Sequence, residues 1–386
     1  MKAHFPEEFM AASMALDVAH TDKLAAFAKE VKAMGIPLLA PDINRSHANF
    51  TVERLEDGRL AIRYALAAIK GVGEKAMEAV VAAREKGGPF RSLSDFAHRV
   101  DPQLLNRRQI EQLAAAGAFD SLEPDRARVH AGAEAIMRLA QESAEARARG
   151  QSSLFGEEAG ALAALRLPQV DPWSKRERLQ QEQAAVGFYL SEHPLGAYAQ
   201  ALARFRVRSS AVLADPDAGL VEGQVIKLAG IIEGYNERRA RQSGDRFGVL
   251  RLSDTDGGFE LLVFREQLEV ARLLVEKNVP ILVEAELRRR NGDDEWRLQA
   301  RSLTDLDDAL ARLGMRFKLR VVAPEAAEAL ARSLAQARDG RGVIEVVVPV
   351  DAEHEAVVEL GRQFAVSPLL AGELARLPGV TAVWEA

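Results

Sequence analysis

The spacing of hydrophobic residues differs between the two parts of this chain. Up to about residue 190, apolar side chains recur every three or four positions, as on one face of an α-helix, and glycine or proline ends most runs. The pattern predicts a helical first part in which short extended segments separate the helices. Helices are expected over 9–34, 74–84, 92–100, 107–116, 125–149 and 175–189, and extended segments over 41–52 and 60–66.

From Val225 onward the apolar residues follow the period of β-strands. Five such runs succeed one another, with a helical stretch between the third and the fourth. This is the sequence order of the OB-fold, a small five-stranded barrel. Further strands and helices after it indicate a small module. The runs are 225–232, 246–252, 259–264, 280–287 and 295–303, the helix is near 267–275, and the module has strands at 317–322 and 343–350, each followed by a helix.

The expected fold class is therefore multidomain, α plus β. It combines a helical helix-hairpin-helix domain, a five-stranded OB-fold β-barrel and a small C-terminal α+β module. A chain of 386 residues is long enough for two to four such domains. No apolar run approaches the ~20 residues that span a bilayer, so no membrane partner is expected. The absence of cysteine excludes disulfides and fits a cytoplasmic location.

The charge of the chain restricts where nucleic acid could bind. A net charge of -6 argues against a globally basic DNA coat protein, so any contact with nucleic acid has to be local. Between Gly58 and Ile110, Lys and Arg outnumber Asp and Glu by ten to five. This basic stretch contains the most informative motif of the sequence.

The segment Ile69–Ala76 places two glycines in a turn that leads directly into an amphipathic helix. Glycine permits backbone torsions closed to other residues, and the first N–H groups of a helix favour an anion such as phosphate. A helix-hairpin-helix motif holds a nucleic-acid backbone in this way without reading bases. An ordinary glycine turn between two helices is the alternative. The residues expected to contact duplex DNA are Lys70, Gly71, Gly73, Lys75, Arg84 and Arg91.

Arginines and aromatic residues gather in and beside the first hairpin of the predicted barrel. OB-folds bind single strands through basic loops and stacking aromatic rings. Phe264 lies inside an apolar run and is assigned to the core. A barrel that serves only as a spacer between proteins is the alternative, because acidic residues at 293–295 dilute the charge of the next hairpin. The residues expected to contact single-stranded DNA are Tyr235, Arg238, Arg239, Arg241, Arg246 and Phe247.

A short peptide, Gln151–Phe155, follows the glycine that ends the long helix. The Gln151 amide can hydrogen-bond to a partner's backbone, and Leu154 and Phe155 offer an apolar anchor pair for a pocket. The peptide is therefore a candidate for docking on another protein. The alternative is a loop that folds its two apolar residues back onto this chain.

Residue types that carry catalysis are not arranged as an active site. The seven histidines are scattered, without metal-ligand spacing. Asp254 and Asp256 run into Gly257 and Gly258 between two strands, which is typical of a turn rather than of a two-metal centre. We expect no catalytic residue, no metal site and no cofactor in this chain.

Together these segments resemble the C-terminal portion of the alpha subunit of bacterial DNA polymerase III, the replicative family C polymerase. The resemblance is strong to about Leu303 and weaker over the last ~80 residues. It rests on His4–Ala12, Pro41–Ser46, Ile69–Ala83, Pro89–Leu93, Asn106–Arg108, Gly117–Leu122, Gln151–Phe155 and Gly187–Leu195.

The resemblance implies both domains and partners. Gln151, Leu154 and Phe155 would form the family's internal peptide for the beta sliding clamp. The implied partners are duplex DNA, single-stranded DNA, the clamp, the clamp-loader tau subunit and the rest of the polymerase III core. The implied domains are a tail of the fingers region (1–57), the helix-hairpin-helix domain (58–124), a long helix with clamp peptide and connector (125–222), the OB-fold (223–310) and a tau-binding-like module (311–386).

The resemblance does not extend to the phosphoesterase domain, the palm with its metal-binding aspartates or most of the fingers. In the family, DNA-directed nucleotide addition and its magnesium belong to those parts, so we expect that this chain alone does not polymerise DNA. A DNA repair or recombination factor that joins hairpins to an OB-fold is the alternative function. A structural adaptor is another, and an anticodon-binding part of a synthetase would explain only the barrel.

Overall fold

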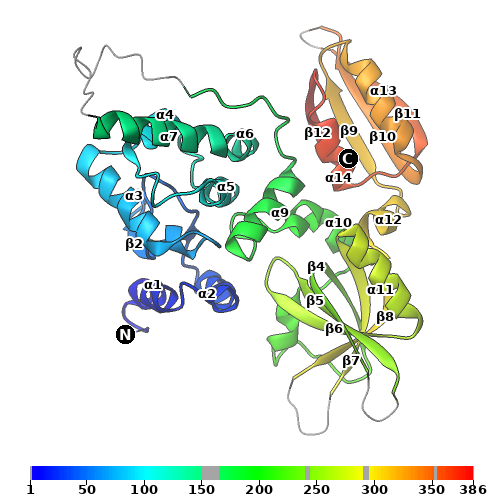
Figure 1. Ribbon diagram of the computed structural model, residues 1–386. Helices are drawn as coiled ribbons and strands as arrows, with labels where there is room; N and C mark the ends of the chain where they lie inside the picture. Colours follow the sequence, from blue (N-terminus) through cyan, green and yellow to red (C-terminus); the bar gives the residue numbers. More distant parts are fainter. Residues whose placement is uncertain (1, 150–164, 240–243, 290–294, 352–353, 386) are drawn as a thin grey trace. The chain divides into compact units, whose positions relative to one another are not determined.

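The computed structural model describes residues 2–149, 165–239, 244–289, 295–351 and 354–385. They form two compact units, Met1–Glu192 and His193–Ala386 (Figure 1). Within the described part of the chain, no helix combines the length and the apolar composition that crossing a membrane requires.

The first unit consists of helices around a small sheet of order β1-β3-β2. Side-chain caps begin two of its helices: Ser92 accepts a hydrogen bond from the N–H of Asp95, and Asn106 forms a capping box with Gln109. The elements are α1 (Pro6–Leu16), α2 (Thr21–Ala33), β1 (Leu38–Leu39), β2 (Thr51–Arg54), β3 (Leu60–Arg63), the 3₁₀ turn η1 (Leu66–Ala68), α3 (Glu74–Gly87), α4 (Leu93–Arg99), α5 (Arg107–Ala115), α6 (Arg126–Ala131), α7 (Ala133–Ala148) and α9 (Lys175–Val186).

Two helices that the sequence predicted as continuous are divided. The expected helix over 9–34 becomes α1 and α2, and Gly132 separates α6 from α7 within 125–149. A Cβ atom at Gly132 would lie 2.5 Å from the Leu167 side chain and 3.0 Å from the Arg128 carbonyl oxygen. A larger residue there would crowd Leu167, which packs against the helix from a distant segment, a contact that helical periodicity does not reveal.

One apolar cluster extends through the first unit, from Met10 to Val186. Side chains of the extended segments, such as Ile43 and Phe50, share this core with Ile69 of the glycine turn. The expected boundary between 1–57 and 58–124 falls in the turn between β2 and β3, which pair in one sheet. These segments and the start of 125–222 therefore fold as one unit, and the second unit begins at His193.

In the second unit, five strands close into a barrel in the order β4-β5-β6-β8-β7. β6 and β8 are parallel, the other neighbouring strands are antiparallel, and α11 follows β6. This topology confirms the predicted OB-fold. The elements are η2 (Pro194–Tyr198), α10 (Ala199–Arg204), η3 (Ser210–Ala214), β4 (Val225–Arg239), β5 (Arg246–Ser253), β6 (Gly258–Phe264), α11 (Glu266–Lys277), β7 (Ile281–Arg288) and β8 (Arg297–Asp305).

The last part is a four-stranded sheet of order β11-β10-β9-β12, with α13 on one face (Figure 1). The predicted α+β module is confirmed, although the sequence did not predict β11 or β12. The residues of β11 lack a strict alternation of polar and apolar types, because Ala356, Val357 and Val358 follow one another. The elements are α12 (Leu306–Ala311), β9 (Arg316–Val321), α13 (Ala326–Gln336), β10 (Arg338–Pro349), β11 (Glu355–Phe364), α14 (Pro368–Leu374) and β12 (Val380–Glu385).

Candidate nucleic-acid interface

The glycine turn before α3 forms an exposed backbone corner. Gly71 has a φ of +75°, in the left-handed region, and nothing lies within 4 Å of the position that a Cβ atom would take there. Gly73 is the N-cap of α3 and is also exposed. Because the first N–H groups of a helix have no intrahelical partner, α3 presents its N-terminal donors at this corner.

Two cations and one carboxylate lie at the corner. Lys70 and Lys75 are both exposed. The neighbouring Glu74 is exposed too, and one of its carboxylate oxygens accepts a hydrogen bond from Asn49 at 3.4 Å. The corner is therefore accessible to solvent and carries more positive than negative charge.

The N-terminus of α5 adjoins the same corner. A Cβ atom on Gly73 would lie 3.6 Å from Nε2 of Gln109, which closes the capping box of α5. Arg107 and Arg108 begin this helix and are exposed. The sequence analysis assigned no DNA contact to them, although a pair of arginines directly after the cap Asn106 is a signal that could have indicated one.

Arg84 and Arg91 differ in accessibility. Arg84 is buried, and its Nη1 donates hydrogen bonds to the carbonyl oxygens of Ile43 at 3.0 Å and Ser46 at 2.6 Å. The expected phosphate contact of Arg84 is therefore wrong, because this face of α3 points into the unit. Arg91 is exposed, and its DNA contact stays a prediction.

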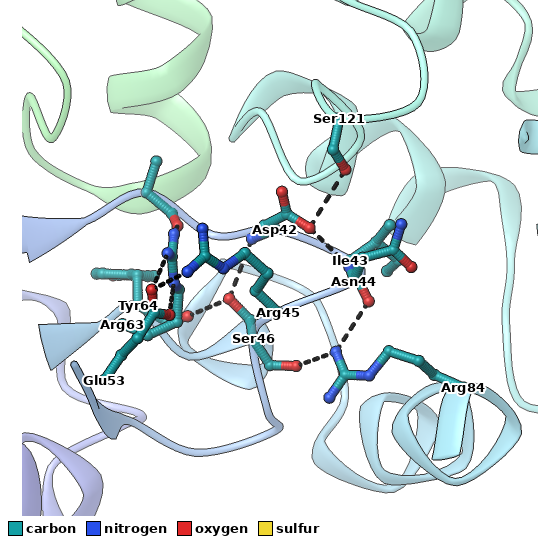
Figure 2. Close-up of polar contacts among 11 residues, drawn as sticks. Asp42, Ile43, Asn44, Arg45, Ser46, Glu53, Arg63, Tyr64, Arg84 and Ser121 are labelled. Carbon is teal, nitrogen blue, oxygen red and sulfur yellow. Dashed lines mark hydrogen bonds and ion pairs between the residues drawn. The ribbon is translucent and has the colours of Figure 1, made fainter. Parts of the chain in front are cut away.

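Figure 2 shows the polar cluster that receives Arg84, which we call the 42–46 hub after its central segment. Asn44 donates to the carbonyl oxygen of Phe90 at 2.9 Å and accepts from its N–H at 2.7 Å. The Ser46 hydroxyl donates to the carbonyl oxygen of Tyr64 at 2.8 Å. The hub thus connects α3 with the chain on both sides of the hairpin and fixes the orientation of the corner.

An ion pair in Figure 2 joins β2 to β3. The Arg63 guanidinium donates to both carboxylate oxygens of Glu53, at 2.9 and 3.0 Å, and Arg45 pairs with the same carboxylate. The hydrogen bonds from Arg63 hold the pKa of Glu53 below its ordinary value of 4.5.

A row of three side chains crosses the outside of the barrel. Arg238 on β4 is opposite Phe247 on β5, and Phe247 is opposite Phe264 on β6. Residues directly opposite each other point to the same face of a sheet. The two phenylalanine rings stack with centroids 5.7 Å apart and an interplanar angle of 25°. We call Arg238, Phe247 and Phe264 the outer row.

The assignments of two aromatic residues have to be exchanged. Phe264 is half-buried on the outer row, so the prediction that it belongs to the core is wrong. Tyr235 packs against the barrel core instead, with its ring over Gly248. Burial and the hydrogen bond that it donates to Glu237 raise the pKa of Tyr235 to about 12. A register shift in β4 between Ile232 and Gly234 precedes Tyr235, and only the structure reveals it.

The remaining basic residues of the barrel lie at two hairpins. Arg239 and Arg246 are exposed and face each other across β4 and β5, whereas Arg241 lies outside the described residues. At the hairpin between β7 and β8, the Arg289 guanidinium lies 4.1 Å from the centroid of the Trp296 ring. Trp296 was not among the predicted contacts, although a tryptophan beside a basic hairpin is a signal that could have indicated one.

The acidic pair of the barrel forms a turn, as predicted. The N–H of Asp254 donates to the Gly257 carbonyl oxygen at 2.8 Å, and its carboxylate accepts from the Ser210 hydroxyl at 2.8 Å. In the portion of the chain that the structure describes, no group of three or more His, Asp or Glu side chains could hold a metal ion. The docking residues Gln151, Leu154 and Phe155 lie outside that portion.

Comparison with solved structures finds proteins that match less than a quarter of this chain. The mitochondrial single-stranded DNA binding protein Rim1 of S. cerevisiae is 17% identical, covers 22% of this chain and 94% of its own, and has a TM-score of 0.19. The second OB-fold domain of replication protein A from Methanococcus maripaludis is 14% identical over 22% of this chain and 87% of its own, with a TM-score of 0.18. At these scores the assignment of the barrel depends on its strand topology.

Comparison by sequence is more informative. A family model described as helix-hairpin-helix motif matches residues 35–129. DNA polymerase III subunit alpha of Caulobacter vibrioides (strain NA1000 / CB15N) is 38% identical over 387 residues, which cover 98% of this chain and 32% of that protein. The subunit of Escherichia coli (strain K12) is 32% identical over 379 residues, 95% of this chain and 32% of the relative. The chain spans about a third of the length of these relatives, and it belongs to their family, that of the bacterial DNA polymerase III alpha subunits.

Proposed function

We propose that this chain is the DNA-holding and clamp-tethering part of a replicative DNA polymerase. The observation that carries the proposal is the exposed corner at Gly71 and Gly73, where helix donors and two lysines converge. Phosphates of the duplex product would bind there through main-chain amides, without sequence preference. The adjacent arginines of α5 would extend the contact along the backbone.

Reversal of charge at the corner tests duplex binding. Replacement of Lys70 and Lys75 by Glu should reduce the slope of log affinity against log salt by roughly 2, since each phosphate contact contributes about 0.9. Fluorescence anisotropy with a labelled duplex measures this slope. Lys29→Glu with Lys86→Glu makes the same charge change at exposed positions away from the corner and is the control. An equal slope for the two double variants would remove the proposed duplex site.

The outer row is the proposed contact for single-stranded template. Phe247 and Phe264 offer aromatic faces at the outside of the barrel, and Arg238 lies in line with them. Stacking on bases and a cation for the backbone are the two elements of sequence-tolerant single-strand binding. Arg239, Arg246 and Arg289 would surround this platform from the two hairpins.

Gln151, Leu154 and Phe155 would tether the chain to the beta sliding clamp. A tether raises the effective concentration of the polymerase on its template, so that a weak peptide can support long synthesis. In a pull-down with purified clamp, Leu154→Ala with Phe155→Ala should abolish capture and leave duplex binding unchanged. Capture at the wild-type level would contradict the tether.

The C-terminal module would bind the clamp-loader tau subunit. Support comes from an apolar groove of about 570 Å³ between α13 and the sheet, on a module that the family uses for this contact. Leu330 and Leu334 of α13, Val346 and Val348 of β10, and Val358 and Leu360 of β11 line it. Leu360→Asp should weaken tau binding in a surface plasmon resonance measurement, because a charge would enter an apolar contact.

The polymerisation step itself would need the rest of the polymerase III core. Template-directed extension of a primer by the purified chain with magnesium would contradict this part of the proposal.

A further inference from the structure

The end of α9 lies directly beneath the exposed corner. Gly187 is the C-cap of α9, with φ of +104°, and its N–H donates to the carbonyl oxygen of Gln183 at 2.7 Å. The main chain of the corner is fastened to the same helix end, since the N–H of Lys70 donates to the carbonyl oxygen of Ala185 at 2.8 Å. About 115 residues of sequence separate these two segments, so only the fold brings them together.

The side chain of Lys70 passes over Gly187. A Cβ atom on Gly187 would lie 3.1 Å from Cε and 3.3 Å from Nζ of Lys70, and 1.9 Å from Cγ2 of Thr21. Because position 187 has no side chain, the Lys70 ammonium can occupy the space over it. The ammonium lies beside the C-terminal turn of a helix, where the helix dipole favours a cation.

A buried carboxylate holds the chain after Gly187 in place. Glu182 is 1% exposed, and its Oε1 accepts hydrogen bonds from the N–H groups of Leu190 at 2.9 Å and Ser191 at 2.7 Å. Its Oε2 accepts from Nη1 of Arg126 at 3.2 Å, and Arg126 also pairs with Asp120. The surface under Lys70 is therefore rigid, because a buried and fully bonded network fixes the backbone on both sides of Gly187.

We propose that Gly187 is a positioning residue for Lys70 and sets the direction in which this lysine meets a duplex phosphate. The inference rests on the proposed function of the corner. It adds that a residue distant in sequence, outside the helix-hairpin-helix motif, bears on how Lys70 makes its contact. A Cβ atom at position 187 would shift the end of the Lys70 side chain by a few tenths of an ångström, in addition to its closer contact with Cγ2 of Thr21.

The experiment measures the salt dependence of duplex binding for Lys70→Ala, Gly187→Ala and the double variant, from about 50 to about 200 mM salt. Loss of the Lys70 phosphate contact should reduce the slope by roughly 0.9 and the affinity by on the order of tenfold in Lys70→Ala. Gly187→Ala should reduce both in the same direction by a smaller amount. The double variant should match Lys70→Ala, because Gly187 acts through Lys70 and the two effects are not additive.

Gly58→Ala is the matched control. Gly58 also has a left-handed φ, +86°, but nothing lies within 4 Å of its Cβ position. Alanine at this φ has a cost in backbone free energy but does not crowd Lys70. The midpoint of thermal unfolding of Gly58→Ala should therefore fall, while its slope of log duplex affinity against log salt stays unchanged. If Gly187→Ala does not fold, Thr21→Ala with Gly187→Ala removes the closest clash and keeps the crowding of Lys70.

The possible outcomes distinguish the proposed duplex site from the proposed role of Gly187. A wild-type slope for Lys70→Ala overturns the proposed duplex site. A reduced slope for Lys70→Ala together with a wild-type slope for Gly187→Ala leaves the duplex site intact and overturns the positioning role of Gly187. Additive losses in the double variant overturn it as well, since they would show that Gly187 acts independently of Lys70.

Discussion

The corner before α3 and the outer row of the barrel present opposite kinds of surface. The corner offers main-chain donors and lysines without an aromatic ring, and the buried 42–46 hub and the end of α9 support it from beneath. The outer row offers two stacked rings and an arginine on the pleated face of a sheet. The first chemistry suits phosphates at fixed spacing, and the second suits bases that are no longer paired.

The two regions differ in what holds their exposed groups in place. At the corner, the orientation of exposed donors depends on hydrogen bonds far below the surface. At the barrel, strand register alone brings the three members of the outer row together. We therefore expect substitutions at Arg84 and in the 42–46 hub to change stability, and substitutions in the outer row to change binding.

The largest expected effect tests the support of the corner. Arg84→Ala leaves two buried carbonyl oxygens without their donor, which should lower the free energy of unfolding by about 3 kcal/mol. Chemical denaturation with urea measures this loss. At a temperature where the variant is folded, its slope of duplex affinity against salt should equal that of the wild type.

Arg84→Lys is the control for this variant. It keeps the positive charge, but its Nζ ends one bond short of the position that Nη1 of Arg84 occupies, so most of the stability loss should remain. A stable Arg84→Lys protein, together with weakened duplex binding in Arg84→Ala, would show that Arg84 contacts phosphate. That result would remove the contrast between the two regions.

The next largest effect is expected on single-strand binding by the outer row. Phe247→Ala with Phe264→Ala should weaken binding of a single-stranded oligonucleotide by about 2 kcal/mol, roughly 30-fold, because stacking contributes about 1–3 kcal/mol per base. Fluorescence anisotropy with a labelled oligonucleotide checks this loss, and duplex binding should be unaffected. Tyr235→Phe, which keeps its ring on the core, should bind like the wild type; equal losses in both proteins would disprove the outward platform.

The smallest effect concerns pH and the first unit. The folded pKa of Glu53 is lowered, so its ion pair stabilises the protein above the unfolded value of about 4.5 and is lost as pH falls through the folded pKa. The difference in unfolding free energy between wild type and Glu53→Gln should therefore be largest near neutral pH and shrink below pH ~4.5. Urea titrations at several pH values measure it. A difference independent of pH would show that Glu53 acts through packing.

Periodicity could predict the helices and barrel strands because each depends on neighbours three, four or two positions away. It failed where distant segments meet. Arg84 has a side chain that commonly binds phosphate. In the fold, however, the 42–46 hub, which is distant in sequence, accepts both of its hydrogen bonds. Phe264 lies in an apolar run, yet its place on the pleat points it outward to Phe247.

Residue types and local spacing were sufficient to predict the order of the barrel strands, the glycine turn with its two lysines, and the family likeness. The folded chain was needed to tell which cations face solvent, which aromatic ring packs against the barrel core and which residue lies beneath Lys70. The physical reason is that burial and strand register depend on contacts between residues far apart in the chain, and such contacts leave no local pattern.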